Sequence, residues 1–337
     1  MMHSITLNFE DGLTRIIDSL PHETVAETAY RHRLNIPLDC ADGACGTCKC
    51  FCKTGDYDPG DYIEDALSDE EAEKGYGLAC QMRPNTDLVI EILASSAACK
   101  VEVQSYSSIV KQVEFLSSEV VKLQVETLEK IDFLPGQYVN IEIPGTGYTR
   151  SYSFSNKPGQ NLAEFIIRLI PDGVMSSFLR NGINAGQKLR IKGPLGSFYS
   201  RDLVRPTLFF AGGTGIAPFL SMLESMKEKG NTLPITLFYG ATLAENVVEI
   251  NRLKAFSEHF PLKMYTCVSG EETKAFAKGY VNQWINKSEL AEEDYDIYIC
   301  GPNAMVEAVK QSLHEHDIHH SNFYLEKFLP SGETMTS

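Results

Sequence analysis

The sequence predicts three modules: a small α+β module at residues 1–97, an antiparallel β barrel at residues 98–203, and a parallel α/β module at residues 204–337. The first stretch contains a hairpin signal, one helical pattern and a cysteine-rich loop. Short strand-like runs broken by Gly and Pro dominate the second, and apolar strands alternate with helical stretches in the third. Dense short strands are typical of barrels, and βαβα order is typical of a parallel sheet. The predicted fold class is therefore multi-domain, α+β and α/β.

Length and composition agree with this division. The chain has 337 residues, 43% hydrophobic and 22% charged, which is ordinary for a globular protein of two or three domains. A net charge of −15 disfavours binding to nucleic acid or to an anionic membrane. Residues 1–100 hold eighteen Asp and Glu against eight Lys and Arg. An acidic surface of this kind is usually only solvated, but it can also attract a basic protein partner.

The nine cysteines are expected in a reducing cytoplasm, because the N-terminus lacks the apolar run of a signal peptide. In that compartment clustered cysteines indicate metal or redox chemistry rather than disulfides. The uncharged run PTLFFAGGTGIAPFLSML approaches the length of a membrane span, but three Gly and an internal Pro interrupt it. It is predicted to form a buried strand, a loop and a helix instead.

The first module is expected to begin with a hairpin, since ITLNFEDGLTRIID alternates apolar and polar residues around Asp11 and Gly12. Small residues near 95–100 indicate a linker. The other expected elements are a helix at 23–34, a strand at 49–55, an acidic helical stretch at 64–75 and a strand at 88–93.

Four cysteines have the spacing of a plant-type [2Fe–2S] cluster: Cys40, Cys45, Cys48 and Cys80. Gly43 and Gly46 would let the backbone pass close to the cluster sulfurs and turn its N–H groups toward them. A structural zinc site normally shows a second close pair of ligands, and Cys80 stands alone. Buried free thiols would need neither this spacing nor these glycines. Cys50 and Cys52, two apart on the next strand, are expected to be core residues.

A cluster passes one electron whereas nicotinamide supplies two, so a flavin is expected between them. In the barrel, Arg150, Ser151, Tyr152 and Ser153 lie on one strand, and alternation places Arg150 and Tyr152 on the same face. That face could hold a diphosphate and stack on a ring system. Alone the pattern is weak, because an Arg and a Tyr on a strand are more often surface and core residues.

A second candidate in the barrel is the turn after Arg168, which would deliver an anion-binding helix N-terminus at Gly173, Val174, Met175 and Ser176. In the third module, a glycine-rich loop follows the strand TLFFA directly and precedes a helix, as a diphosphate site requires. Glycines after a strand are often plain turns. The loop consists of Gly212, Gly213, Thr214, Gly215, Ile216, Ala217 and Pro218. Cys300, Gly301 and Pro302 end another strand at the edge where open α/β sheets bind ligands.

Taken together, R-x-Y-S, G-G-T-G-x-A-P, C-G-P and E-K-F resemble the ferredoxin–NADP reductase superfamily. The module order resembles the single-chain reductases of aromatic-ring dioxygenases and diiron monooxygenases. Within that group, residues 62–81 are most similar to the reductases of benzoate 1,2-dioxygenase systems. The resemblance implies a β-grasp plant-type ferredoxin domain, an FAD-binding barrel and an NAD-binding domain. It also implies electron flow from NADH through FAD and the cluster to a terminal oxygenase.

The resemblance also implies roles for single residues. Arg150 would pair with the FAD diphosphate, Tyr152 would stack on the isoalloxazine, and Ser153 would bond near the flavin N5. Amides of Gly173 to Ser176 would meet the FAD diphosphate, and Gly213 to Pro218 would face that of NADH. Cys300 would lie beside the nicotinamide, with Glu326 and Phe328 near the flavin. In the plant enzymes the stacking aromatic ends the chain, whereas nine residues follow Phe328 here.

NADH is expected rather than NADPH, because the run ATLAENVVEIN contains Glu245 and Glu249 and no basic residue that could bind a 2′-phosphate. The partner is expected to be a Rieske-type oxygenase that docks on the acidic first module, and the chain is expected to be monomeric. Electron flow to a Rieske centre is downhill from a plant-type cluster. Three alternatives stay open at this point: a reductase for a diiron monooxygenase, a reductase for an anthranilate-type dioxygenase, and a metal-binding carrier module without reductase activity.

Overall fold

The computed structural model describes residues 2–38, 40, 42–100, 103–181, 183–286, 288, 290 and 294–328. It divides into two compact units. The first comprises Met1–Gln104 with Gly193–Ser197, and the second comprises Ser105–Lys192 with Phe198–Ser337. The barrel and the α/β module therefore belong to the same unit. The domain limits at residues 97 and 203 stay predictions.

The first unit is built on a five-stranded sheet of order β2-β1-β7-β3-β5, the β-grasp arrangement that the resemblance implies. The expected hairpin is present, with Gly12 at φ +78° in its turn. Helix α1 begins where a capping box between Thr24 and Glu27 satisfies the first backbone N–H groups. The elements are β1 (Ser4–Phe9), β2 (Thr14–Asp18), α1 (Val25–Arg31), β3 (Lys49–Thr54), α2 (Asp69–Glu73), β5 (Tyr76–Leu78) and β7 (Leu88–Ile92).

The stretch expected to be a weakly structured linker is helical instead. Helix α3 (Ser96–Lys100) buries Ala98 and Cys99, and the Ser96 hydroxyl donates to Asp11 Oδ2 at 2.7 Å. The small side chains that indicated flexibility are the ones that allow close packing. This stretch is therefore a packed part of the first unit and not an open connection.

The barrel consists of a six-stranded sheet of order β11-β10-β13-β8-β9-β12. A bridge between Phe154 and Phe165 joins the two ends of that order, so the sheet curls toward closure. Phe133 stacks on Phe154 inside it, with ring centroids 3.8 Å apart. The elements are β8 (Gln104–Phe115), β9 (Val120–Ile131), β10 (Tyr138–Glu142), β11 (Thr149–Ser153), β12 (Gln160–Arg168), α4 (Val174–Arg180) and β13 (Lys188–Leu195).

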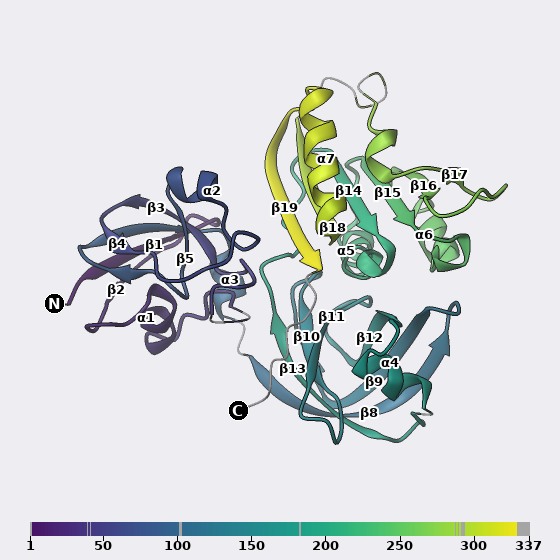
Figure 1. Cartoon of the computed structure of the whole chain (residues 1–337), viewed down its shortest axis with the longest axis horizontal. Helices are drawn as coiled ribbons and strands as arrows, with labels where there is room; N and C mark the ends of the chain where they lie inside the picture. The colour runs from purple at the N-terminus through teal and green to yellow at the C-terminus, as the bar shows by residue number, and fades with distance from the viewer. Residues whose placement is uncertain are drawn as a thin grey trace. The chain divides into compact units, whose positions relative to one another are not determined.

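The α/β module has a parallel sheet of order β17-β16-β15-β14-β18-β19. Phe210, Phe238 and Tyr265 form a stacked ladder across three adjacent strands, which helps to fix their register. The elements are β14 (Thr207–Gly212), α5 (Ile216–Lys229), β15 (Ile235–Ala241), α6 (Ile250–Phe256), β16 (Leu262–Val268), β17 (Ala277–Lys278), β18 (Tyr295–Pro302), α7 (Asn303–Glu315) and β19 (His320–Phe328). Figure 1 shows α7 running alongside β18 and β19.

The strand order of the parallel sheet indicates where a ligand would bind. From β14 the chain proceeds through β15 and β16 on one side, and later returns to β18 and β19 on the other side. The carboxyl ends of β14 and β18 flank this switch point, where open α/β sheets form their binding crevice. The uncharged run that approaches a membrane span forms β14 and α5, as predicted. Among the described residues, no helix combines the length and the apolarity that a membrane crossing needs.

Candidate functional site

The four predicted cluster ligands lie close enough to perturb one another. A hydrogen bond with Cys45 is the main cause that lowers the pKa of Cys40, and an interaction with Cys40 is the main cause that raises the pKa of Cys80. Cys48 interacts with Cys80 in turn. Among the described residues, no group of three or more His, Cys, Asp or Glu side chains is arranged to hold a single metal ion. The observation that agrees with a two-iron cluster is the mutual contact of the Cys40, Cys45, Cys48 and Cys80 thiols.

Backbone amides around these thiols also fit a cluster. The Gly43 N–H donates to Cys80, and the Thr47 N–H donates to Cys45. Such donors stabilise the negative charge of iron-bound sulfur. Gly43 and Gly46 both adopt positive φ, at +80° and +73°. A Cβ on Gly43 would lie 2.3 Å from the Asp61 carbonyl oxygen, so this glycine is also required by the chain segment packed against the loop.

The five remaining cysteines lie outside this group. Cys50 is fully buried against Gly77 and Met82, as predicted, while Cys52 is only half-buried. The others, Cys99, Cys267 and Cys300, are buried.

Thiol reactivity should follow this burial. Desolvation raises the pKa of Cys267 to about 11 and that of Cys99 to about 12. At pH 8 a thiol of pKa 11 is about 0.1% thiolate, and the thiolate is the reactive form. We expect iodoacetamide at pH 8 to label Cys52 of the holoprotein first, and to leave Cys99 and Cys267 unmodified on that timescale. Peptide mass spectrometry measures this, and equal labelling of Cys52 and Cys267 would contradict the packing.

Strand β11 carries the predicted flavin residues on two faces. Tyr152 and Arg150 lie opposite Val139 and Ile141 on one face, and Tyr152 packs against the barrel core. The Arg150 guanidinium donates to the Thr149 carbonyl at 2.8 Å, and no carboxylate among the described residues pairs with it. That cation fits a phosphate ligand. On the other face, the Ser151 hydroxyl donates to Asn140 at 2.7 Å.

The second barrel candidate is less open than the sequence indicates. Gly173 precedes α4 with no side-chain cap, and the Ser176 hydroxyl accepts from the Ile170 N–H at 2.8 Å. Met175 and Ser176 are buried, so only backbone groups there could meet a ligand. Arg168 is exposed at the end of β12. Val174, which begins α4, is partly buried against the barrel core.

The glycine loop lies between β14 and α5, as predicted, and the strand order places it at the switch point of the sheet. Gly213–Gly215 form a 3-10 turn that leads into α5. Gly213 has φ +54°, and no described heavy atom lies within 4 Å of its Cβ direction, so a ligand can approach. Thr214 is partly exposed beside it. Ile216, Ala217 and Pro218 are buried in the core, so their side chains serve packing.

Two glycines of the same edge are needed for packing. A Cβ on Gly215 would lie 2.3 Å from the Cys300 carbonyl oxygen. A Cβ on Gly301 would lie 2.6 Å from the Met305 side chain. The turn after β14 therefore meets the end of β18 through the Gly215 and Cys300 backbone, and a side chain at Gly215 would clash there. At Gly301 an added side chain would instead require the Met305 side chain to move aside.

Two side chains from different strands, Ser153 and Cys300, meet at Glu326 of β19. The Ser153 hydroxyl of β11 donates to Glu326 Oε2 at 3.2 Å, and the Cys300 thiol of β18 donates to the same oxygen at 3.6 Å. Parallel register sets Cys300 opposite Glu326 and Pro302 opposite Phe328. Burial, and then the Glu326 charge, raises the pKa of Cys300, so the thiol keeps its proton at neutral pH. Figure 1 shows β19 ending toward the barrel strands.

Phe328 is 40% exposed and is the last described residue, so the residues after it lie outside the described part. Asn303, which follows Pro302 as the first residue of α7, is not among the site residues predicted from the sequence. Its Oδ1 atom is buried and has no hydrogen-bond partner among the described residues. A buried acceptor of this kind fits a ligand that brings a donor, such as a nucleotide hydroxyl or carboxamide. The position of this Asn directly after the C-G-P motif is the sequence feature that could have indicated a ligand-binding role.

Glu245 and Glu249, the two acids that favoured NADH, both bond to side chains of the barrel. The Ser118 hydroxyl donates to Glu245 at 2.7 Å, and Lys122 pairs with Glu249 at 2.7 Å. Glu249 is therefore not the open negative charge that the sequence argument assumed. The repulsion of a 2′-phosphate is reduced accordingly at this position.

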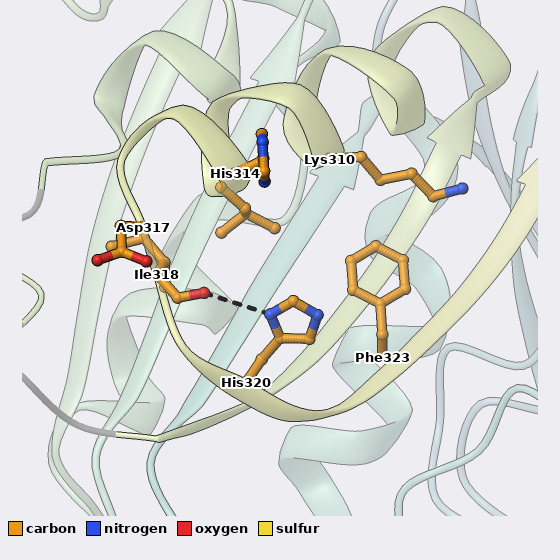
Figure 2. Close-up of a pocket in the computed structure, with 7 residues that line it drawn as sticks. Lys310, His314, Asp317, Ile318, His320 and Phe323 are labelled. Atoms are coloured by element: carbon orange, nitrogen blue, oxygen red, sulfur yellow. Dashed lines mark hydrogen bonds between the residues drawn. The ribbon is translucent and has the colours of Figure 1, made fainter.

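A pocket of about 330 Å³ lies elsewhere, between the end of α7 and the start of β19. Figure 2 shows Lys310, His314, His320 and Phe323 around it, with His320 Nδ1 bonded to the Ile318 carbonyl at 3.3 Å. β19 starts here and reaches Glu326 only at its other end. None of the predicted site residues lines this pocket, so its size does not make it the cofactor site.

Comparison with known proteins finds three family models along the chain. A 2Fe-2S iron-sulfur cluster binding domain matches residues 8–85, an oxidoreductase FAD-binding domain matches 107–199, and an oxidoreductase NAD-binding domain matches 209–311. The ferredoxin reductase in carbazole 1,9a-dioxygenase has a similar structure, with a TM-score of 0.67 at 24% identity, covering 98% of this chain and 99% of the other. That structural likeness concerns the fold alone.

Curated relatives match over the whole length. The toluate 1,2-dioxygenase electron transfer component of Pseudomonas putida is 46% identical, covering 98% of this chain and 100% of the relative. The 2-halobenzoate 1,2-dioxygenase electron transfer component of Burkholderia cepacia is 45% identical, covering 98% and 99%. The anthranilate 1,2-dioxygenase electron transfer component of Acinetobacter baylyi is 38% identical, covering 100% of both chains.

Proposed function

Since the chain belongs to the family of aromatic-ring 1,2-dioxygenase electron transfer components, with iron–sulfur, FAD and NAD domains, we propose that it is the NADH-dependent reductase of a benzoate-type 1,2-dioxygenase. The observation that carries this proposal is the meeting of Ser153, Cys300 and Glu326. It brings the predicted flavin strand of the barrel to the predicted nicotinamide edge of the parallel sheet.

FAD, when bound, supplies the step between a two-electron donor and a one-electron cluster. The chain supplies the binding and orientation. Arg150, which pairs with no carboxylate among the described residues, would hold the FAD diphosphate, and Tyr152 on the same face of β11 would stack on the ring system. The Ser153 hydroxyl is oriented by Glu326 Oε2, which also holds the proton of the Cys300 thiol nearby.

NADH binds at the switch point. The open backbone at Gly213 and the N-terminus of α5 receive its diphosphate. Cys300, at the carboxyl end of β18, would lie beside the nicotinamide. The Asn303 Oδ1 atom, which has no partner among the described residues, would accept a hydrogen bond from the nucleotide, and Phe328 would border the face where the nicotinamide docks.

The [2Fe–2S] cluster is held by Cys40, Cys45, Cys48 and Cys80. The Gly43 and Thr47 amides donate to two of these sulfurs and favour their ionised form. Single electrons leave the chain from this loop.

The partner is the oxygenase component, and its substrate is benzoate or a close derivative. The names of the three relatives refer to toluate, halobenzoate and anthranilate, which are all substituted benzoates. This supports a single aromatic ring with a carboxylate as the substrate of the partner oxygenase. The reductase component of propane 2-monooxygenase from Gordonia sp. is only 28% identical, so a monooxygenase partner is less well supported. Reduction of purified benzoate and anthranilate oxygenases by the NADH-loaded chain tests the choice. Faster reduction of the anthranilate enzyme would overturn the benzoate assignment.

The docking surface for the oxygenase is the segment beside the cluster loop. Ile63 N–H donates to the Gly43 carbonyl at 3.3 Å, so this segment borders the ligands directly. The Ile63 side chain is half exposed, and acids flank it at Asp61, Glu64 and Asp65. An apolar centre with a negative rim fits a basic partner surface.

Neutralising this rim should slow electron delivery without affecting the flavin. We expect the triple variant Asp61→Asn, Glu64→Gln, Asp65→Asn to reduce the oxygenase about tenfold more slowly at low ionic strength, with a flatter salt dependence. Flavin reduction by NADH should stay at the wild-type rate. The matched control makes the same change in net charge on the α/β module: Glu258→Gln, Glu272→Gln and Glu315→Gln. An unchanged rate and salt dependence in the first triple would remove this surface from the proposal.

The chain is further proposed to act as a monomer in the cytoplasm, where a reducing environment keeps the four cluster cysteines available to iron. Sedimentation at micromolar concentration tests the monomer, and a dimer mass would replace it.

A further inference from the structure

A second meeting of the barrel and the α/β module lies away from the redox site. It is made by residues 245–252, which connect β15 to the first turn of α6. The segment contacts the barrel at three places, each through side chains with short distances. Glu245 and Glu249 are the acids that favoured NADH over NADPH, and the other residues of this segment belong to no predicted cofactor site.

The outermost contact is with the turn between β8 and β9. Asn246 is buried and bonds twice: the Ser117 hydroxyl donates to its Oδ1 at 2.7 Å, and its Nδ2 donates to Glu119 at 3.0 Å. The Ser118 hydroxyl donates to Glu245 at 2.7 Å. The side-chain amide of Asn246 thus finds its hydrogen-bond partners in the barrel. Separating the two modules would leave this buried amide without them, which is energetically costly.

The middle contact is an ion pair between Lys122 of β9 and Glu249, at 2.7 Å. The side chains are only 17% and 9% exposed. Glu249 has φ +57°, a left-handed conformation that a residue with a Cβ rarely adopts. Such strain persists only where the surroundings impose it, and Lys122 together with Arg252 does so here.

The innermost contact is Arg252, whose planar guanidinium binds three groups. One Nη atom lies 2.8 Å from Glu164 Oε1 in the barrel, and the other donates to the Ser155 carbonyl at 2.8 Å. Glu224 of α5, in the same module as Arg252, accepts at 3.1 Å. Burial raises the pKa of Glu164, but bonds from Gln124 and Ser155 and the Arg252 charge outweigh it, so the net pKa is lowered. Glu164 is therefore ionised at neutral pH.

This contact lies two residues from the redox site along the chain. Ser153 ends β11 and meets Glu326 of the α/β module at 3.2 Å. Phe154 follows, fully buried in the barrel core, and Ser155 then gives its carbonyl to Arg252. The α/β module thus contacts the chain just before and just after Phe154: Glu326 bonds to Ser153, and Arg252 bonds to Ser155. Arg252 and Glu326 together restrict how β11 can move relative to Cys300.

We propose that Arg252 is a positioning residue, which sets the approach of the nicotinamide edge to the flavin strand by clamping Glu164 and the Ser155 carbonyl. The inference rests on the proposed NADH–FAD reaction. A five-donor planar fork suits this task, whereas a lysine could replace its charge but not its geometry. A buried ion pair adds little net stability once desolvation is counted, but loss of one partner alone is destabilising, so the test must separate orientation from stability.

The test uses the holoprotein with Arg252→Gln. Anaerobic stopped-flow absorbance gives the limiting rate of flavin reduction and the apparent Kd for NADH separately. We expect the limiting rate to fall at least about tenfold, while the apparent Kd changes less than about threefold, because the NADH contacts are intact and only the approach is altered.

Arg205→Gln is the matched control. The Arg205 side chain is 27% exposed against 25% for Arg252, and it also pairs with carboxylates, Asp296 at 2.9 Å and Asp294 at 3.3 Å. Arg205 precedes β14, and its two partners lie at the start of β18 in the same α/β module, so neither belongs to the barrel. This variant should keep the wild-type limiting rate. An equal loss in Arg205→Gln and Arg252→Gln would mean general destabilisation and would overturn the positioning role.

Two further variants keep the test decisive if Arg252→Gln folds poorly. Arg252→Lys retains the charge and should show an intermediate limiting rate. Glu164→Gln removes the barrel partner, and combining it with Arg252→Gln should add little to the loss of the single Arg252→Gln change. Wild-type rates in both Arg252→Lys and Glu164→Gln would refute the clamp. If the wild-type holoprotein itself shows no flavin reduction by NADH, the proposed function fails instead.

Discussion

Cys80→Ser should abolish electron delivery to the oxygenase while NADH still reduces the flavin. Cys80 comes from a separate part of the chain and interacts with both Cys40 and Cys48, so its loss removes the ligand that closes the site. A hydroxyl is a far weaker ligand for iron than a thiolate. We expect the iron and the electron paramagnetic resonance signal of the reduced cluster to be lost, with oxygenase reduction at background.

The matched control for this change is Cys52→Ser. Cys52 follows the cluster loop on β3, is half-buried, and contacts the Thr54 carbonyl rather than a cluster ligand. It should retain full iron content and full oxygenase reduction. Loss of the cluster in Cys52→Ser, or its retention in Cys80→Ser, would contradict the ligand assignment.

Gly215→Ala should nearly eliminate flavin reduction by NADH. The added Cβ would lie 2.3 Å from the Cys300 carbonyl oxygen, which is backbone and cannot move aside alone. Either the turn after β14 or the turn after β18 must shift, and the overpacking itself costs about 1–3 kcal/mol. A shift of about 1 Å between Cys300 and the flavin strand can lower the rate about a hundredfold. Single-turnover reduction at saturating NADH measures it.

Gly230→Ala separates this effect from ordinary glycine loss. Gly230 caps the far end of α5 at φ +69°, and no described heavy atom lies within 4 Å of its Cβ direction. Alanine there should reduce stability by about 1 kcal/mol through left-handed strain alone. Its flavin reduction should stay at the wild-type rate. Similar rates for Gly215→Ala and Gly230→Ala would show that the close packing at Cys300 does not control the reaction.

The cluster loop could be predicted from the sequence because its chemistry is local. Three ligands and two glycines fall within nine residues, and the required geometry leaves few alternatives for that spacing. The same holds for the turn after β14, where Gly213 and Thr214 lie at a strand end that periodicity identifies. At Gly215 and Gly301, however, the atoms nearest to an added Cβ belong to the protein itself and not to a ligand. The sequence alone does not reveal this difference.

Other features depend on residues that meet only after folding. Glu249 reads as an exposed acid in ATLAENVVEIN, yet Lys122 from a distant strand neutralises it. Arg252 is the next basic residue along the chain, and nothing local indicates that it reaches the Ser155 carbonyl. The small residues at 95–100 were likewise expected to be a linker, because composition does not reveal that Cys99 is buried.

The central claim is that one chain carries electrons from NADH through FAD to a [2Fe–2S] cluster. The most direct measurement is an anaerobic titration of the holoprotein with NADH, followed by absorbance and by electron paramagnetic resonance. Flavin bleaching together with a rhombic S = ½ signal from the reduced cluster is the expected result. Flavin and cluster that both remain oxidised in excess NADH would contradict the account.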